Sequence, residues 1–273
     1  SLLFICKKFC KEYGRKLYVI NLAEPEKSSA YNPFQNASPT ACKDMLVNMT
    51  DWSEEHYKSN TERYLQRLAI CLNQGEIPLS FHNLVQYASG EEFQLLSAKL
   101  LKNQVISKTE HLMNLDIIKT CGKIAENAAA RFLTIAESEA GQIFQEEGID
   151  IYTALQEKAV ILFILNPLLY QELPPAVGRL LLIDAKQAVS KCIHHPLPRA
   201  FFVFDEINTY ASATLTDLVN KSRSANITAI LATQSLSDLD FAVNENFKEQ
   251  IIENCNNYLV MRQNSAKNAE QWG

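Results

Sequence analysis

The residues with the clearest chemical potential are two adjacent carboxylates, Asp205 and Glu206, which directly follow the apolar run Phe201 to Phe204. An unbroken apolar run is typical of a buried strand in a parallel sheet, and ligands bind at the carboxyl edge of such sheets. At that edge the first carboxylate can support the water shell of Mg²⁺, and the second can polarise an attacking water. The pattern is that of a Walker B element, and it predicts phosphoryl-transfer chemistry.

A second polar group, Thr233, Gln234 and Ser235, follows the next apolar run, Ile227 to Ala232. If the two runs are parallel strands, Gln234 reaches the same edge, where it can sense a terminal phosphate or orient water. The alternative is a polar strand end that bonds only to its own loop. Arg223 lies at the end of the preceding helix, where it is either a solvated charge favoured by the helix dipole or an arginine finger for a neighbouring subunit.

A phosphate-binding loop of the form G-x-x-x-x-G-K-[ST] is missing from the eight glycines of this sequence. Gly122 and Lys123 come nearest, but Ile124 replaces the hydroxyl residue and no glycine lies five positions before Gly122. We therefore expect the phosphate-binding loop to lie upstream of residue 1, and we expect this polypeptide alone to bind ATP poorly.

The elements that must position these residues alternate between strand-like and helical patterns in the last third of the chain. Their periodicity predicts a mostly parallel α/β sheet with helices on both faces. The predicted strands are 17–20, 160–165, 200–204, 227–232 and 258–261, and the predicted helices are 1–13, 174–191, 214–224, 244–254 and one that starts near Ser265.

The stretch from about residue 40 to 147 shows only helical signals, among them Ser59 and Glu62, which predict a capping box. A proline- and serine-rich connection, 24–40, precedes it. We predict an all-α domain, 44–147, inserted between two parts of an α/β domain, 1–43 and 148–273.

Composition is that of a folded chain, with 47% hydrophobic residues and a formal net charge of -5 that argues against a uniformly basic nucleic-acid surface. The longest apolar run, 159–165, is far short of the roughly 20 residues that span a bilayer. Seven scattered cysteines indicate reduced thiols and a cytoplasmic chain. We interpret Cys192, His194 and His195 as a helix end that runs into a loop, not as a metal site.

These motifs together resemble a known family, the TraG/TraD-type coupling ATPases of conjugative type IV secretion. The resemblance rests on Asp205 and Glu206, on 222–224, 232–235 and 238–239, on 252–257 with the segment through Arg262, and on 13–19 and 31–34. By specific motif it covers about a third of the chain.

The resemblance implies a RecA-like, P-loop-type ATPase that forms a homo-hexameric ring anchored in the bacterial inner membrane, with this chain on its cytoplasmic side. It implies ATP and Mg²⁺ as ligands, with Asp205 supporting the metal indirectly, Glu206 activating water, Gln234 sensing the γ-phosphate and Arg223 acting in trans. Thr233 and Arg262 are further nucleotide contacts by the same resemblance. The implied partners are single- or double-stranded DNA, relaxase and relaxosome proteins, and type IV secretion channel components.

Two alternatives stay open at this point. One is the related type IV secretion ATPase that powers pilus and channel assembly. The other is a catalytically inactive adaptor that docks relaxase or effector proteins through its helical domain. An intact phosphate-binding loop upstream would exclude the adaptor, and paired transmembrane segments before that loop would favour the coupling protein.

Overall fold

The computed structural model describes residues 2–49, 52, 54–240, 242–244 and 246–262. The chain forms two compact units, 1–173 and 174–273, and each is described by itself. All seven cysteines are free thiols.

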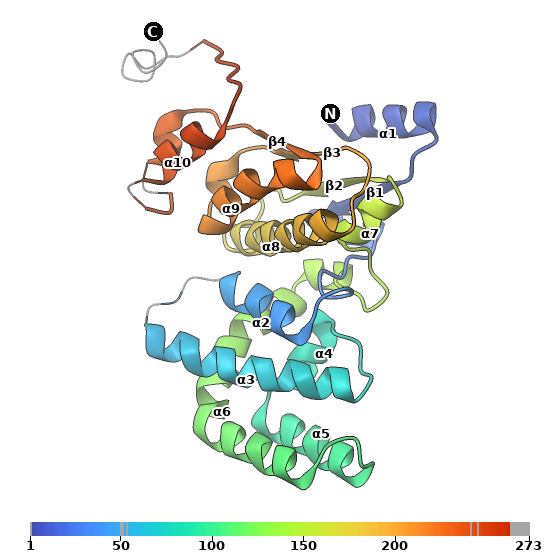
Figure 1. Cartoon of the computed structure of the whole chain (residues 1–273), viewed down its shortest axis with the longest axis vertical. Helices are drawn as coiled ribbons and strands as arrows, with labels where there is room; N and C mark the ends of the chain where they lie inside the picture. The colour runs from blue at the N-terminus through green and yellow to red at the C-terminus, as the bar shows by residue number, and fades with distance from the viewer. Residues whose placement is uncertain (1, 50–51, 53, 241, 245, 263–273) are drawn as a thin grey trace. The chain divides into compact units, whose positions relative to one another are not determined.

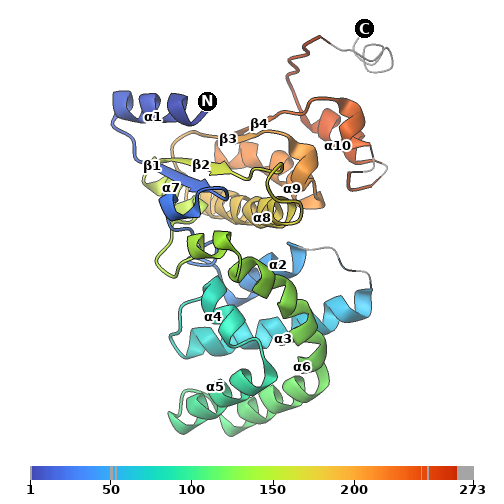
Figure 2. The same cartoon turned by 180° about the vertical axis from the view of Figure 1, so that it is seen from behind.

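The first unit contains a parallel strand pair, β1 (Leu17–Asn21) and β2 (Val160–Ile164). Helix α1 (Leu2–Tyr13) ends at Gly14, whose φ of 60° suits glycine, and the amide of Arg15 then donates to the carbonyl of Cys10 at 2.9 Å. Both views show α1 on one side of the strand pair and α7 (Ile151–Gln156) on the other (Figures 1 and 2). Residues 143 positions apart thus pair in register, Leu17 with Val160.

The rest of the first unit is helical, and its helices gather away from the strand pair (Figure 1). Their bounds are α2 (Pro39–Asn48), α3 (Glu55–Gln74), α4 (Phe81–Gln86), α5 (Gly90–Lys102) and α6 (Lys108–Ala136), with the short 3₁₀ helices η1 (Pro25–Lys27) and η2 (Glu139–Ile143). Tyr64, Leu68 and Phe93 are fully buried in their core. Burying each such side chain contributes about 1.5–3 kcal/mol, so packing and not propensity holds these helices together.

Helices α2, α4, α5 and α6 each follow a serine whose side chain accepts a backbone N–H of the first turn. Ser107 and Glu110 form a complete capping box at the start of α6, and hydrogen bonds from Ser107 and Gln74 lower the pKa of Glu110 to about 2. The capping box predicted at Ser59 is wrong, because α3 already begins at Glu55 and Ser59 lies inside it. Helix propagation through a good helix-forming stretch overrides a local start signal.

The second unit contains the other parallel pair, β3 (Ala200–Phe204) and β4 (Ile227–Leu231). Helices α8 (Leu173–His194) and α9 (Ala213–Ser222) lie on one side of it in both views (Figures 1 and 2). The remaining elements are η3 (Ile207–Tyr210), η4 (Arg223–Ala225), η5 (Leu236–Leu239) and α10 (Phe247–Asn254). Phe202 and Phe204 are half-buried, whereas Phe201 and Val203 on the opposite face are exposed.

The four described strands match predicted strands, and both pairings are parallel as expected. The strand predicted at 258–261 is wrong: the segment is irregular, and Leu259 is 89% exposed. An apolar run becomes a strand only when a neighbouring strand satisfies its backbone, and none of the described strands pairs with this one. The helix predicted from Ser265 lies outside the described residues. The predicted domain boundaries stay a prediction.

Within the described part of the chain, no helix is both long and apolar enough to cross a bilayer.

Candidate active site

The carboxyl edge of the β3–β4 pair brings together the predicted carboxylates and the predicted glutamine. Phe204 pairs with Leu231 at the end of the ladder. Beyond it the backbones stay joined, because the amide of Ala232 donates to the carbonyl of Phe204 at 2.8 Å and the amide of Ile207 donates to that of Ala232 at 3.2 Å. The two loops that carry the predicted chemistry therefore start side by side.

Gln234 contacts Glu206 directly. The side-chain Nε2 of Gln234 donates to Oε1 of Glu206 at 2.8 Å. The Asp205 side chain is exposed, and its Oδ1 accepts from the amide of Glu206 at 3.1 Å. Both carboxylates are thus oriented by hydrogen bonds while they remain open to a ligand at the strand edge.

Glu206 has an unusual backbone, with φ of 50° and ψ of 52°, in the left-handed region. Six described non-glycine residues have positive φ, and three of them follow helices, where a left-handed residue closes the helix end: Glu76, Gln104 and Lys158. Two more are asparagines, which tolerate this region: Asn166 and Asn226. Glu206 neither closes a helix end nor is an asparagine, and its left-handed conformation costs about 1–2 kcal/mol. Such strain is concentrated at functional sites.

Thr233 and Ser235 are engaged in their own loop. The hydroxyl of Thr233 donates to the carbonyl of Ser235 at 3.1 Å, and Oγ of Ser235 accepts from the amide of Ser237 at 3.2 Å, which caps η5. The alternative of a strand end that bonds to its own loop therefore describes Thr233 and Ser235, but not Gln234. Nucleotide contact by Thr233 stays a prediction.

One of the two predicted arginines, Arg223, lies away from this edge. Arg223 is exposed and precedes β4, so it stands at the amino end of the strand whose carboxyl end leads to Gln234. Five residues of strand separate the two ends, about 16 Å at 3.3 Å per residue. Arg262 is exposed in the irregular segment after α10. The structure does not bring Arg223 to the carboxylates, and the roles of both arginines stay predictions.

The donor set at the edge suits Mg²⁺ held through water and phosphate. Mg²⁺ prefers oxygen ligands, keeps several waters and typically uses one or two carboxylates together with substrate phosphates. Asp205 and Glu206 supply such oxygens. Among the described residues, no group of three or more His, Cys, Asp and Glu side chains could hold a metal ion by itself. The two carboxylates therefore suit a metal ion that binds together with a nucleotide.

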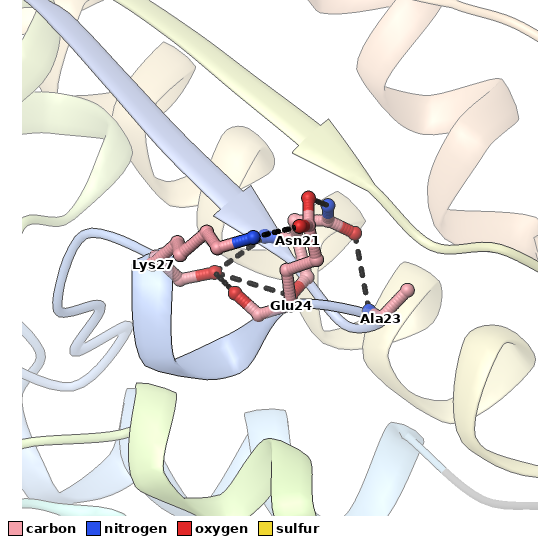
Figure 3. A network of polar contacts seen from close by, with 5 residues as sticks. Asn21, Ala23, Glu24 and Lys27 are labelled. Carbon is pink, nitrogen blue, oxygen red and sulfur yellow. Dashed lines mark hydrogen bonds and ion pairs between the residues drawn. The ribbon is translucent and has the colours of Figure 1, made fainter.

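The carboxyl end of β1 offers a contrasting turn (Figure 3). Oδ1 of Asn21 accepts from the amide of Ala23 at 3.1 Å, and its Nδ2 donates to Glu24 at 3.2 Å. Lys27 donates to the other carboxylate oxygen of Glu24, and the resulting hydrogen bond and charge lower the pKa of Glu24. These polar groups satisfy one another, so the turn is closed.

A cavity of about 460 Å³ lies elsewhere in the first unit. Its walls come from the segments before α2, before α4 and around the start of α7, and include Asn32, Leu79, Gly148 and Thr153. None of the predicted site residues lines it.

Two residues that the sequence did not single out adjoin the carboxylate turn. The hydroxyl of Tyr210 donates to the carbonyl of Asp205 at 2.8 Å, and the ring of Tyr210 lies against Gly178 of α8. The available signals were only a tyrosine four residues after Glu206 and a glycine inside a predicted helix.

The chain has the RecA-like α/β fold, as predicted. It is similar to the conjugative coupling protein TrwBΔN70 in its unbound form, with a TM-score of 0.57 and 15% identity over 87% of this chain and 55% of that one. TrwB in complex with ADP and Mg²⁺ matches with a TM-score of 0.56. VirB4 of Thermoanaerobacter pseudethanolicus matches with a TM-score of 0.51 and 15% identity, over 91% of this chain and 64% of that one.

The last part of the chain also resembles a sequence family. Residues 199–273 match the family model described as the TraM recognition site of TraD and TraG. The predicted resemblance to TraG/TraD-type coupling proteins is thereby confirmed. The chain spans about 55% of the TrwB chain that it matches. No curated protein sequence matches it significantly.

Proposed function

We propose that this chain is part of the motor of an ATP-driven coupling protein, which delivers a relaxase–DNA complex or protein substrates to a type IV secretion channel. The observation that carries the proposal is Glu206, held in a strained backbone conformation and hydrogen-bonded to Gln234, inside the segment that matches TraD and TraG. Strain that places a carboxylate at a parallel-sheet edge is typical of a reacting group.

In this proposal Glu206 is the general base. Its carboxylate accepts the proton of the water that attacks the γ-phosphate, and Gln234 orients that carboxylate at 2.8 Å. Asp205 would hold the water shell of the Mg²⁺ that accompanies ATP, and this ion would supply charge neutralisation. The TrwB structures with an ATP analogue and with ADP and Mg²⁺ support nucleotide and metal binding of this kind.

The remaining parts of the proposal follow the family. We propose a homo-hexamer on the cytoplasmic side of a bacterial inner membrane, with Arg223 reaching the active site of the neighbouring subunit. Its position at the other end of β4 supports action in trans over action within one chain. The proposed partners are DNA, relaxosome proteins and channel components.

The assembly ATPase remains a second candidate because the fold of VirB4 also matches. A shared fold does not decide between two functions. The match of residues 199–273 to TraD and TraG favours the coupling protein.

The test is ATP turnover, with and without single-stranded DNA, on a polypeptide extended upstream to include the predicted phosphate-binding loop. We expect Glu206→Gln to reduce turnover by about 10²- to 10⁴-fold, the contribution typical of a general base. Glu91→Gln, an equivalent change at an exposed position of α5, is the matched control and should retain full turnover.

Each outcome has a distinct meaning. DNA-stimulated hydrolysis that collapses only in Glu206→Gln supports both the motor and the role of Glu206. Equal hydrolysis in the unsubstituted protein and Glu206→Gln removes Glu206 from the mechanism. An extended protein without activity in any form makes the docking adaptor the better explanation.

A further inference from the structure

The peptide group between Asp205 and Glu206 is held at both of its polar atoms. Its carbonyl oxygen accepts from the hydroxyl of Tyr210 at 2.8 Å. Its N–H donates to Oδ1 of Asp205 at 3.1 Å. The Tyr210 ring that carries the donor of the first bond is only 9% exposed. The Asp205 side chain that accepts the second bond is flexible and exposed.

This peptide group decides whether Glu206 is left-handed. Rotating a peptide plane by half a turn changes ψ of the residue before it and φ of the residue after it by about 180° each, so Glu206 would leave the left-handed region for negative φ. The same rotation turns the carbonyl of Asp205 away from Tyr210. The hydrogen bond from Tyr210 therefore exists only in the strained form.

We propose that Tyr210 is a positioning residue for the proposed active site: its hydroxyl selects the left-handed form of Glu206 and so keeps the Glu206 carboxylate beside Gln234. This inference rests on the proposed role of Glu206 in hydrolysis. Tyr210 acts through the backbone and is not itself a reacting group.

The surroundings of Tyr210 are built for this bond. Gly178 lets α8 approach its ring, since a Cβ at position 178 would lie 2.5 Å from Cβ and 2.8 Å from Cγ of Tyr210. Those atoms are the root of the side chain and cannot swing aside.

The test compares Tyr210→Phe, which removes the hydroxyl and keeps the ring, with Tyr18→Phe. Tyr18 donates to Glu157 at 2.6 Å in the first unit, so its substitution removes a hydrogen bond far along the chain from the carboxylates. In the extended protein we expect Tyr210→Phe to lower kcat about 3- to 10-fold, the value of one lost hydrogen bond, with KM unchanged. Tyr18→Phe should leave kcat unchanged.

A second measurement does not depend on hydrolysis. Amide hydrogen exchange at Glu206, measured on the 273-residue chain, should accelerate about 3- to 10-fold in Tyr210→Phe and stay constant in Tyr18→Phe. A residue that only packs the core would change thermal stability without changing kcat at a temperature where both forms are folded.

The outcomes separate the two claims. Lower kcat together with faster exchange at Glu206 supports the inference. Unchanged kcat in an active enzyme overturns it, whatever the exchange shows. If the unsubstituted extended protein does not hydrolyse ATP, the proposed function fails, and exchange alone then decides: unchanged exchange at Glu206 overturns the positioning role, and faster exchange supports it.

Discussion

The two parallel strand pairs in the described part of the chain end in polar turns of opposite character. After β1, the side chains of Asn21, Glu24 and Lys27 bond to one another and to the turn backbone, which leaves a closed structure (Figure 3). After β3, Glu206 takes a strained conformation, and the Asp205 side chain is exposed. Self-satisfied polar groups stabilise a turn, whereas oriented groups that stay open can serve a ligand.

A comparison of the left-handed residues that follow β2 and β3 sharpens the contrast between the two strand pairs. Asn166, which follows β2, has φ of 50°, the same value as Glu206 after β3. Asparagine lowers the cost of this region through local hydrogen bonding, whereas a glutamate away from a helix end has no such compensation. A sequence selected for stability alone would have no reason to keep glutamate at position 206. The strained end is thus the one where the proposed function accounts for the residue.

The largest effect on stability should come from Gly178→Ala in α8. The added methyl meets Cβ of Tyr210 at 2.5 Å, and overpacking of this kind costs about 1–3 kcal/mol. Gly122→Ala in α6 is the matched control, because its methyl finds only ordinary contacts at 3.7 and 3.8 Å. At position 122, replacing a glycine in a helix interior by alanine should stabilise the folded protein by up to about 1 kcal/mol. Urea unfolding measures both, and equal effects would show that the approach of Tyr210 to α8 is not tight.

An intermediate effect of opposite sign is expected from Glu206→Gly. Glycine removes the left-handed strain of about 1–2 kcal/mol, but it also increases the conformational entropy of the unfolded chain, which offsets part of this gain. We therefore expect the free energy of unfolding to rise by about 0.5–1 kcal/mol. Asn166→Gly should gain less, because asparagine is already tolerated there. Urea denaturation of the two variants checks this order. A larger gain at Asn166 than at Glu206 would contradict the claim that the carboxylate end is the strained one.

The smallest effect concerns the closed turn after β1. The hydrogen bond from Lys27, and then its charge, lower the pKa of Glu24 below the ordinary 4.5. Because the folded-state pKa is the lower one, this contribution to stability is present above pH 4.5 and is lost as the pH falls from there through the lowered value. Both side chains are exposed, so the effect is small.

An NMR titration of the Glu24 carboxyl carbon measures this directly. Lys27→Met should move the midpoint up toward the ordinary value, and Lys58→Met, at a half-buried position of α3, should not move it. An unchanged midpoint in Lys27→Met would mean that Asn21 and the backbone, and not the ion pair, hold the carboxylate.

Much of the fold could be predicted because its signals are local. The run Phe201 to Phe204 is apolar and ends in two carboxylates, so both the strand and its end were readable. The wrong predictions arose where a local signal met a wider context. Ser59 lies inside a helix that starts earlier, and the apolar segment 258–261 has no strand beside it among the described residues.

The sequence by itself determined the residue types that the proposed chemistry needs and the strands that carry them to one edge. Only the tertiary structure decided that Gln234 bonds to Glu206, that Glu206 is left-handed, and that Tyr210 and Gly178 meet beside it. The reason is physical. A backbone conformation that costs free energy has no local sequence preference of its own, and it persists only where contacts from distant segments hold it in place.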